Sequence, residues 1–318
     1  MATATTKPPR AKKRKLLMRI LIILSAVILA VAIGFLCVIP VLVMGDLTGR
    51  PASMSFYEAA EFGVDATRIT LQTEDGLSIA AWEVMPESPK ATVILLSGIQ
   101  NPSVTGFFGY AKMLRDNGYG ALLIEMRAHG ESEGDTIAFG MNEYLDVKAG
   151  VAYLDGKYDE LPVVVWGTSM GGTTAINAIG RIPELDGLIS CSAFSTLPDM
   201  FCDMMSLMGL PSAYIAVQKP FVWLNCLFTY GSDMIQIHPL NEIQKLDGRP
   251  ALLMHSTEDS QVPYVNFERI MAKAGDDVQT FVREGDYHFI IEQESFENPT
   301  QDAEFSGTVL RFLNEHFS

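Results

Sequence analysis

The sequence predicts an α/β protein with a doubly wound, mostly parallel sheet and a helical cap insertion, preceded by one transmembrane helix. Short apolar runs alternate with helical patterns from about residue 66 onward, which is typical of a parallel sheet covered by helices on both faces. About fifty residues, roughly 196–246, interrupt this alternation, and an uncharged run occupies residues 20–44. At 318 residues the chain is long enough for one large core or at most two modest domains.

The N-terminal segment is expected to anchor the protein in the cell membrane. As a helix, residues 20–44 would extend about 37 Å, which exceeds the ~30 Å hydrocarbon core of a bilayer. The preceding residues, 1–19, carry seven Lys and Arg, and no acidic residue occurs before Asp46. Because basic flanks stay in the cytoplasm, we expect a single-pass protein with a cytoplasmic N-terminus and an extracytoplasmic domain.

Cleavage of this segment is the alternative. A secretory signal peptide has an apolar region of about 7–15 residues and small residues at its cleavage site, whereas this run is longer and lacks such a site. An uncleaved anchor is therefore preferred over a secreted protein. The expected organisation is a basic N-terminus at 1–19, an anchor at 20–44, a tether at 45–65 and a folded domain at 66–318.

The charge of the folded part excludes one class of partner. Residues 46–318 carry 16 Lys and Arg against all 38 Asp and Glu, a net charge of −22. Such a surface repels nucleic acid, so nucleic-acid binding is not expected. Outside the apolar run, three cysteines remain, and an odd number excludes a complete disulfide framework. A bond between Cys202 and Cys226 stays open.

The elements of the domain follow in chain order. The first two strands flank the turn Glu74-Asp75-Gly76 and read as a hairpin. The later strands are nearly continuous apolar runs, as expected for strands buried on both faces, and helical patterns separate them. The expected strands are Arg68–Thr73, Leu77–Val84, Ala91–Leu96, Gly118–Arg127, Leu161–Trp166, Gly187–Cys191, Ala251–His255 and Val278–Val282; the expected helices are Gly106–Asn117, Met141–Leu154, Gly172–Ile179 and Asp302–Phe317.

The insertion at 196–246 has no strand pattern and is rich in Met and aromatic residues. It is expected to form helices over the carboxyl edge of the sheet. Two roles remain open for it. Its apolar side chains can pack against the main domain, and they can form a lid that lines an apolar acyl pocket. The two roles do not exclude each other.

The pentapeptide Gly167-Thr168-Ser169-Met170-Gly171 lies between a predicted strand and a predicted helix. A sharp turn at that place needs small neighbours, and it lifts a serine hydroxyl above the sheet as a nucleophile. The pentapeptide alone is weak evidence, because Ser169 can also be a structural turn residue. Its position between strand and helix makes Ser169 the candidate nucleophile.

A serine hydroxyl needs a base, and the base needs an orienting acid. Asp259 and His288 each follow a predicted strand, at the edge where open α/β sheets place their sites. We therefore expect His288 as the base and Asp259 as the acid. The alternatives are Glu258 and Asp199 for the acid, and His129, His238, His255 and His316 for the base.

Three stretches resemble the α/β-hydrolase fold serine hydrolases over residues 66–318. They are the pentapeptide, Asp259-Ser260-Gln261-Val262-Pro263, and Arg127-Ala128-His129-Gly130-Glu131-Ser132. The chain order of serine, acid and histidine also matches that family. The resemblance implies Ser169 as nucleophile, His288 as general base and then acid, and Asp259 as the orienting carboxylate.

The same resemblance implies an oxyanion hole made of backbone N–H groups. Met170 should supply one donor and Ile99 the other. The sequence departs from its relatives just before Ile99, since Ser97-Gly98 stands where they carry His-Gly. The change affects a side chain only, so the backbone N–H of Ile99 is still available as a donor.

These observations predict a membrane-anchored serine hydrolase that cleaves carboxylic esters, or thioesters or amides, through an acyl-enzyme on Ser169. The expected partner is a small-molecule or lipid-like acyl substrate. The alternatives are a catalytically idle binding or scaffold domain, a serine peptidase and an acyltransferase on the same fold. The histidines lack metal-ligand spacing such as H-E-x-x-H, so no metal and no cofactor is expected. The oligomeric state is not predicted.

Overall fold

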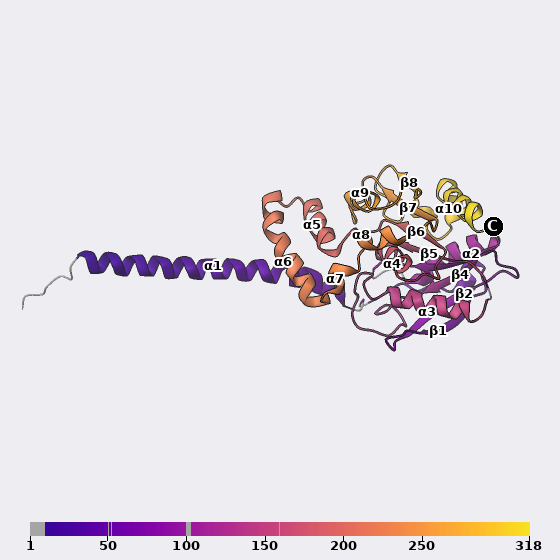
Figure 1. Ribbon diagram of the computed structural model, residues 1–318, viewed down its shortest axis with the longest axis horizontal. Coiled ribbons are helices and arrows are strands. Elements are labelled where there is room, and N and C mark those ends of the chain that lie inside the picture. The colour runs from indigo at the N-terminus through magenta and orange to yellow at the C-terminus, as the bar shows by residue number, and fades with distance from the viewer. Residues whose placement is uncertain (1–9, 50, 52, 100–102, 159) are drawn as a thin grey trace, which may run out of the picture.

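The computed structural model describes the chain apart from residues 1–9, 50, 52, 100–102 and 159. A long helix, α1 (Arg10–Thr48), extends from a domain built on one sheet (Figure 1). The sheet has the order β1-β2-β4-β3-β5-β6-β7-β8. Its strands are β1 (Thr67–Gln72), β2 (Ser78–Val84), β3 (Thr92–Leu96), β4 (Gly120–Ile124), β5 (Val163–Thr168), β6 (Gly187–Cys191), β7 (Ala251–Ser256) and β8 (Gln279–Arg283).

The first strand pairs are antiparallel, β1 with β2 and β2 with β4, and all the others are parallel. Every residue of the five strands from β3 to β7 is buried. This explains the continuous apolar runs, because a strand covered on both faces has no solvent-facing positions to fill with polar residues. The predicted doubly wound, mostly parallel sheet with a hairpin start is confirmed.

Two apolar clusters form the core, one on each face of the sheet. Within β3, Val93 and Leu95 belong to one cluster and Ile94 and Leu96 to the other, as the alternation of a pleated strand requires. The first cluster is covered by α2 (Phe108–Asp116) and α10 (Ala303–His316), and the second by α3 (Tyr144–Asp155), α4 (Met170–Ile179) and α9 (Val265–Met271). The sequence did not predict α9, which has only two turns.

The strand expected at Gly118–Arg127 is shorter than predicted. It ends at Ile124, and two of the three residues that follow, Glu125 and Arg127, bond polar partners outside the sheet. The Glu125 carboxylate accepts hydrogen bonds from the Ser103 hydroxyl and the Val104 N–H, and the Arg127 N–H donates to Asp146 at 2.7 Å. Ala128 then has a positive φ of 61°. The segment before α2 also begins as a 3-10 turn, η2 (Val104–Phe107).

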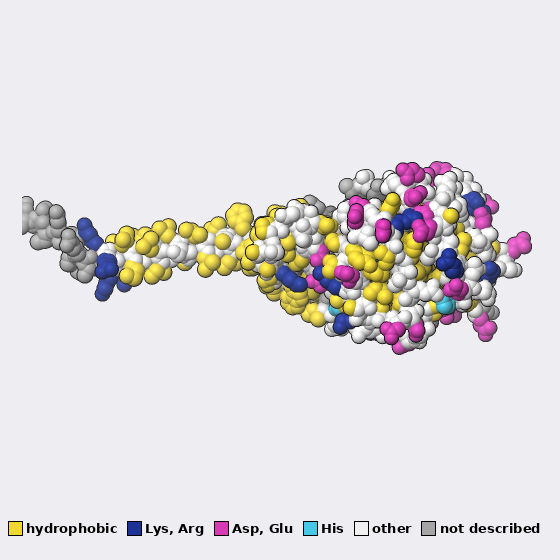
Figure 2. Space-filling view, turned by 90° about the horizontal axis from the view of Figure 1, so that it is seen from above, with side chains coloured by type: hydrophobic (Ala, Val, Ile, Leu, Met, Phe, Trp, Pro, Cys, Tyr) yellow, Lys and Arg dark blue, Asp and Glu magenta, His cyan; other side chains and the backbone are white. Residues whose placement is uncertain are grey.

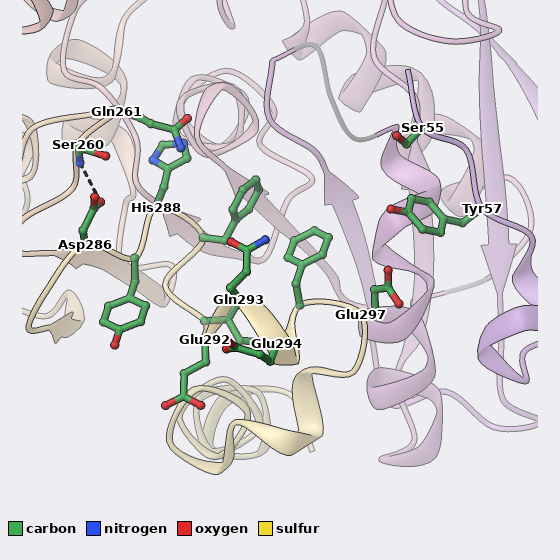
Figure 3. A pocket seen from close by; sticks show the side chains of 14 residues that line it. Ser55, Tyr57, Ser260, Gln261, Asp286, His288, Glu292, Gln293, Glu294 and Glu297 are labelled. Carbon is green, nitrogen blue, oxygen red and sulfur yellow. Dashed lines mark hydrogen bonds between the residues drawn. The ribbon is translucent and has the colours of Figure 1, made fainter. Parts of the chain in front are cut away.

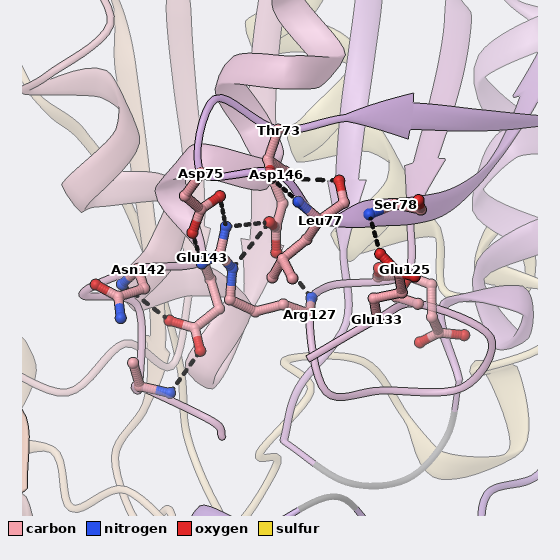
Figure 4. Close-up of polar contacts among 12 residues, drawn as sticks. Thr73, Asp75, Leu77, Ser78, Glu125, Arg127, Glu133, Asn142, Glu143 and Asp146 are labelled. Atoms are coloured by element: carbon pink, nitrogen blue, oxygen red, sulfur yellow. Dashed lines mark hydrogen bonds and ion pairs between the residues drawn. The ribbon is translucent and has the colours of Figure 1, made fainter. Parts of the chain in front are cut away.

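Arg127 joins three parts of the fold (Figure 4). Its guanidinium donates to Asp146 of α3 at 2.8 and 3.0 Å, and to Asp75 of the β1–β2 turn at 2.7 and 3.2 Å. Arg127 and Asp146 are both buried, whereas Asp75 is partly exposed. These bonds raise the pKa of Arg127 despite its burial. The guanidinium is thus held between two carboxylates, and it ties the first hairpin to the sheet and to α3.

Helix α1 is longer at both ends than the anchor expected at 20–44. Its stretch Lys13–Val38 is, by length and composition, long and apolar enough to cross a membrane. At its end, the Ile137 N–H donates to the Thr48 carbonyl at 2.7 Å, and Gly49 forms a bridge with Thr136. Part of the segment expected as a tether also lies against the domain, since Tyr57 N–H donates to the Thr105 hydroxyl at 3.1 Å.

The insertion is helical, as predicted. It comprises α5 (Leu197–Leu207), α6 (Ser212–Tyr230), α7 (Asp233–Gln236), α8 (Pro239–Glu242) and the turn η3 (Ile243–Lys245). Phe201, Val222 and Met234 belong to the core cluster, so packing against the main domain is one of its roles. Cys202 and Cys226 are buried free thiols, and they form no disulfide in this structure.

Candidate active site

Ser169 occupies the sharp turn between β5 and α4, near the middle of the sheet. Its backbone has φ 59° and ψ −121°, a conformation that non-glycine residues rarely adopt and that is found at strained functional turns. The Ser169 N–H donates to the carbonyl of Cys191 at 2.8 Å, which ties the turn to the end of β6. The turn therefore presents Ser169 at the carboxyl edge of the sheet, as expected from the pentapeptide.

Two glycines make this turn possible. A Cβ on Gly167 would collide with the carbonyl of Gly171, and a Cβ on Gly171 would collide with the backbone carbonyls of Leu96 and Ser97. The strand, the turn and the helix therefore approach one another more closely than any side chain allows. This is the physical reason for a glycine on each side of the serine.

Asp259 and His288 form a buried acid–base pair. The His288 Nδ1 lies 2.9 and 3.0 Å from the two oxygens of the Asp259 carboxylate. The N–H groups of Gln261 and Val262 also donate to Asp259, each at 2.9 Å. Burial raises the pKa of Asp259, but the bond and charge of His288 and the two backbone bonds outweigh burial, so the pKa lies below its ordinary value. Because Nδ1 faces Asp259, the other ring nitrogen, Nε2, is available to accept a proton from a serine hydroxyl.

The loop that carries His288 is fastened next to the elbow. The Ser192 hydroxyl donates to the His288 carbonyl at 2.6 Å, and Ser192 directly follows β6, the strand that pairs with β5. On the other side, Arg283 donates to the Ile290 carbonyl at 2.9 Å and pairs with Asp302 at the start of α10. These contacts fasten the His288 loop at the end of β6, the strand that neighbours β5 and its serine turn. Ser192 was not a predicted site residue, because nothing in the sequence relates it to a residue 96 positions away.

The other candidates for base and acid lie in different surroundings. His255 bonds the Val262 carbonyl at 2.8 Å and is 3.7 Å from Asp259, and burial lowers its pKa. His129 is buried and bonds the Arg127 carbonyl at 2.9 Å, while Asp199 pairs with Lys219 at 2.8 Å. Glu258 and His316 are exposed, and His238 precedes α8 in the insertion. Asp259 and His288 are the acid and histidine that the structure brings together.

The predicted oxyanion-hole residues flank the serine. Met170 is the first residue of α4, where the N–H has no acceptor within the helix. Ile99 follows Gly98, and a Cβ on Gly98 would lie 3.4 Å from the Ser169 Cβ and 3.8 Å from its Oγ. The loop before Ile99 thus passes directly over the serine; Gln100 lies outside the described residues. The Ser97 hydroxyl is buried with no hydrogen-bond partner among the residues described.

A cavity of about 960 Å³ adjoins His288 (Figure 3). Its walls come from the loops after β7 and β8 and from Ser55 and Tyr57 of the segment that follows α1. The described lining includes no residue of the insertion, so this cavity is not the apolar acyl pocket expected there. It includes no Lys or Arg either, and four carboxylates line it: Asp286, Glu292, Glu294 and Glu297.

Comparison with known proteins finds similarity over part of the chain. Residues 87–224 match the family model described as Serine aminopeptidase, S33. The chain is 24% identical over 231 residues to uncharacterized protein YqkD of Bacillus subtilis, covering 71% of this chain and 73% of that protein. It is 27% identical over 143 residues to uncharacterized membrane protein YNL320W of Saccharomyces cerevisiae, covering 42% of this chain and 48% of that protein.

Solved structures show the same fold. The Pyrococcus furiosus esterase Pf2001 superposes with a TM-score of 0.67 at 24% identity, covering 86% of this chain and 99% of the esterase. The acylaminoacyl peptidase of Pyrococcus horikoshii superposes with a TM-score of 0.58 at 15% identity, covering 80% of this chain and 42% of the peptidase. The sheet order and these similarities show that the chain has the α/β-hydrolase fold.

Proposed function

We propose that the protein is a serine hydrolase that cleaves carboxylic esters, or thioesters or amides, through an acyl-enzyme on Ser169. The observation that carries the proposal is the strained turn at Ser169 together with the buried pair of Asp259 and His288, both tied to the end of β6. The similarity to an esterase and to the serine aminopeptidase family model adds support. An idle binding domain would have no need for both a strained serine turn and a carboxylate-paired histidine at one edge of the sheet.

The reaction follows from the chemistry of these groups. His288 takes the proton of the Ser169 hydroxyl, Ser169 Oγ attacks the acyl carbonyl, and Asp259 stabilises the imidazolium that forms. The N–H groups of Met170 and Ile99 stabilise the oxyanion. His288 then gives its proton to the leaving alcohol, thiol or amine as the bond to it breaks. Water, deprotonated by His288, attacks the acyl-enzyme; the bond from Ser169 Oγ to the acyl carbon then breaks, His288 returns the proton to Ser169, and the acid leaves.

Peptide hydrolysis is the second candidate. The four carboxylates in the cavity beside His288, with no cation among the described lining residues, favour substrates with a positive charge. The free amino group of a peptide has that charge, and an amine is the leaving group of an amide. Comparing uncharged esters with amino-acid amides and esters separates the two candidates.

We further propose that α1 anchors the protein in the membrane with its N-terminus in the cytoplasm. The support is its apolar stretch Lys13–Val38 and the seven basic residues within 1–19. The active site would then lie outside the cytoplasm.

A fluorophosphonate probe tests the nucleophile. We expect the probe to label the wild-type protein at Ser169, and to label neither Ser169→Ala nor His288→Ala, because only a serine activated by its base attacks phosphorus rapidly. Gel fluorescence and mass spectrometry of the labelled peptide measure this. Labelling at another residue, or equal labelling of the Ser169→Ala protein, would contradict the assignment, provided that circular dichroism shows the variants to be folded.

Gly98→Ala tests the loop over the serine. Its Cβ would be in ordinary contact with Ser169 in the free enzyme, but it would stand where an acyl carbonyl must enter. We expect kcat/KM to fall by about 10- to 100-fold, a loss of roughly 1.4–2.8 kcal/mol of transition-state stabilisation. Thermal unfolding should change little. Unchanged kcat/KM would show that substrate enters from another side.

A further inference from the structure

Exposed apolar side chains gather on the insertion. Outside α1, ten large apolar side chains are exposed among the described residues, and eight of them lie between Leu207 and Ile235. Phe228 and Met208 are the most exposed, at 84% and 77%. The eight are Leu207, Met208, Leu210, Val217, Trp223, Leu224, Phe228 and Ile235. We call these eight side chains the apolar cap face. A monomeric soluble domain rarely gathers its exposed apolar side chains in this way, so the cap face indicates a partner.

The same segment is almost free of charge. Residues 204–232 contain one charged side chain, Lys219, although the chain beyond residue 45 has a net charge of −22. Lys219 pairs with Asp199, and more than half of its side chain remains exposed. The cap face is therefore the part of an acidic protein that can approach an anionic surface without repulsion.

The position of the cap face indicates that its partner is the membrane next to α1. Helix α6 packs against α1, and it is the element of the domain that reaches furthest along α1 toward its N-terminus (Figure 1). The helix α1 is exposed from Lys13 to Phe35 and first becomes partly buried at Leu36, close to the end of the stretch that can span a membrane. The apolar surface of α1 continues onto this end of the domain (Figure 2), whereas most of the acidic side chains in that view lie on the rest of the domain.

The direction of α6 also agrees with a contact between the cap face and a membrane. In Figure 1, α6 crosses α1 steeply. If α1 lies along the membrane normal, α6 therefore lies close to the membrane plane. Its buried residues Gln218, Val222 and Cys226 share the face turned to the domain, which leaves the exposed Val217, Leu224 and Phe228 on the other side. An apolar helix face parallel to a bilayer is the arrangement of interfacial membrane helices.

We propose that the apolar cap face is inserted into the leaflet from which α1 emerges, with Phe228 and Met208 among the acyl chains and Trp223 and Lys219 at the headgroups. Tryptophan prefers the interfacial layer, and a lysine there is attracted by lipid phosphates. This proposal rests on the membrane anchoring proposed above and is independent of catalysis. It gives the insertion a role in holding the domain against the bilayer.

The test uses the full chain reconstituted in vesicles of phosphatidylcholine and phosphatidylglycerol. Phe228→Cys is labelled with the environment-sensitive fluorophore NBD in a Cys37→Ser background; the other three cysteines are buried. Val282→Cys is the matched control, because Val282 is exposed on β8, away from the insertion. We expect nitroxide-labelled lipid to quench the label at 228 and not the label at 282. Aqueous iodide should quench the label at 228 about tenfold less than the label at 282.

Equal iodide quenching at both positions would overturn the proposal. Protection from iodide without quenching by lipid would also overturn it, and would identify a second copy of the chain as the occupant. Failure of the protein to float with the vesicles would overturn both the anchor and the cap proposal.

A double variant, Met208→Glu with Phe228→Glu, gives a second readout. Turnover of a soluble short-chain ester should remain unchanged, while turnover of an ester carried in vesicles should fall several-fold. Equal loss on both substrates would count against the proposal. If the wild-type protein hydrolyses no ester at all, the proposed hydrolase is refuted, and the quenching result still tests the cap proposal.

Discussion

Ester turnover is expected to fall by about 10⁴-fold or more when Ser169 is replaced by alanine, because no acyl-enzyme can form without the hydroxyl. Alanine has a Cβ as serine does, so it bears the same strain at φ 59° and the turn should persist. The backbone bond from residue 169 to Cys191 is also kept. Steady-state hydrolysis of a chromogenic ester by protein in detergent measures the loss, and circular dichroism checks the fold.

The control for this variant is Ser206→Ala, an exposed serine of α5 that should leave turnover unaltered. A second check uses the cooperation of the groups. Because Ser169 and His288 act as one unit, the double variant with both replaced by alanine should be about as slow as Ser169→Ala alone. Turnover of Ser169→Ala within tenfold of the wild type would refute the acyl-enzyme mechanism.

Arg127→Met is expected to lower the free energy of unfolding by about 3–5 kcal/mol, because it leaves the buried Asp146 carboxylate without its counter-charge. Asp146 is fully buried and accepts three hydrogen bonds from Arg127. The variant keeps only the one from its backbone N–H. Thermal unfolding followed by circular dichroism should show a midpoint lower by roughly 10 °C.

Arg68→Met is the matched control for the Arg127 prediction. Arg68 lies in the hairpin that Arg127 contacts through Asp75, and it pairs with Glu131, but both side chains of that pair are more than half exposed. Exposed pairs contribute less than about 1 kcal/mol, so its midpoint should hardly move. Replacing Asp146 by leucine together with Arg127→Met should recover most of the lost stability, since the buried carboxylate is then removed along with its counter-charge. Equal midpoints for the two single variants would contradict the role assigned to Arg127.

The fold was predictable where the signal is local. Each strand from β3 to β7 is an apolar run because its own residues are buried on both faces, and each can be read without knowing its neighbours. The strand expected to reach Arg127 was too long, since Glu125 and Arg127 leave the sheet for partners distant in the sequence. The two-turn helix α9 gives too short a pattern to detect.

The candidate site shows the same division. The turn at Ser169 depends on adjacent glycines, so the pentapeptide predicts it. The bond from Ser192 to the His288 loop depends on the folded sheet, and no sequence pattern indicates it. The insertion shows a further limit. Its Met and aromatic residues were expected to face inward, but sequence composition does not distinguish Phe201, which is buried, from Phe228, which is exposed.

The junction between α1 and the domain has a consequence for how the protein would meet its substrate. The Thr48 carbonyl and Gly49 bond directly to Ile137 and Thr136, so the helix enters the domain without a loose linker at that point. With α1 in a bilayer, the domain would turn about the helix axis but would not tumble freely, and its serine would stay at one height above the lipid. The enzyme would then meet substrate only in a thin layer next to the membrane. The rate of these encounters would depend on the density of substrate at the membrane surface and not on its concentration in the surrounding solution.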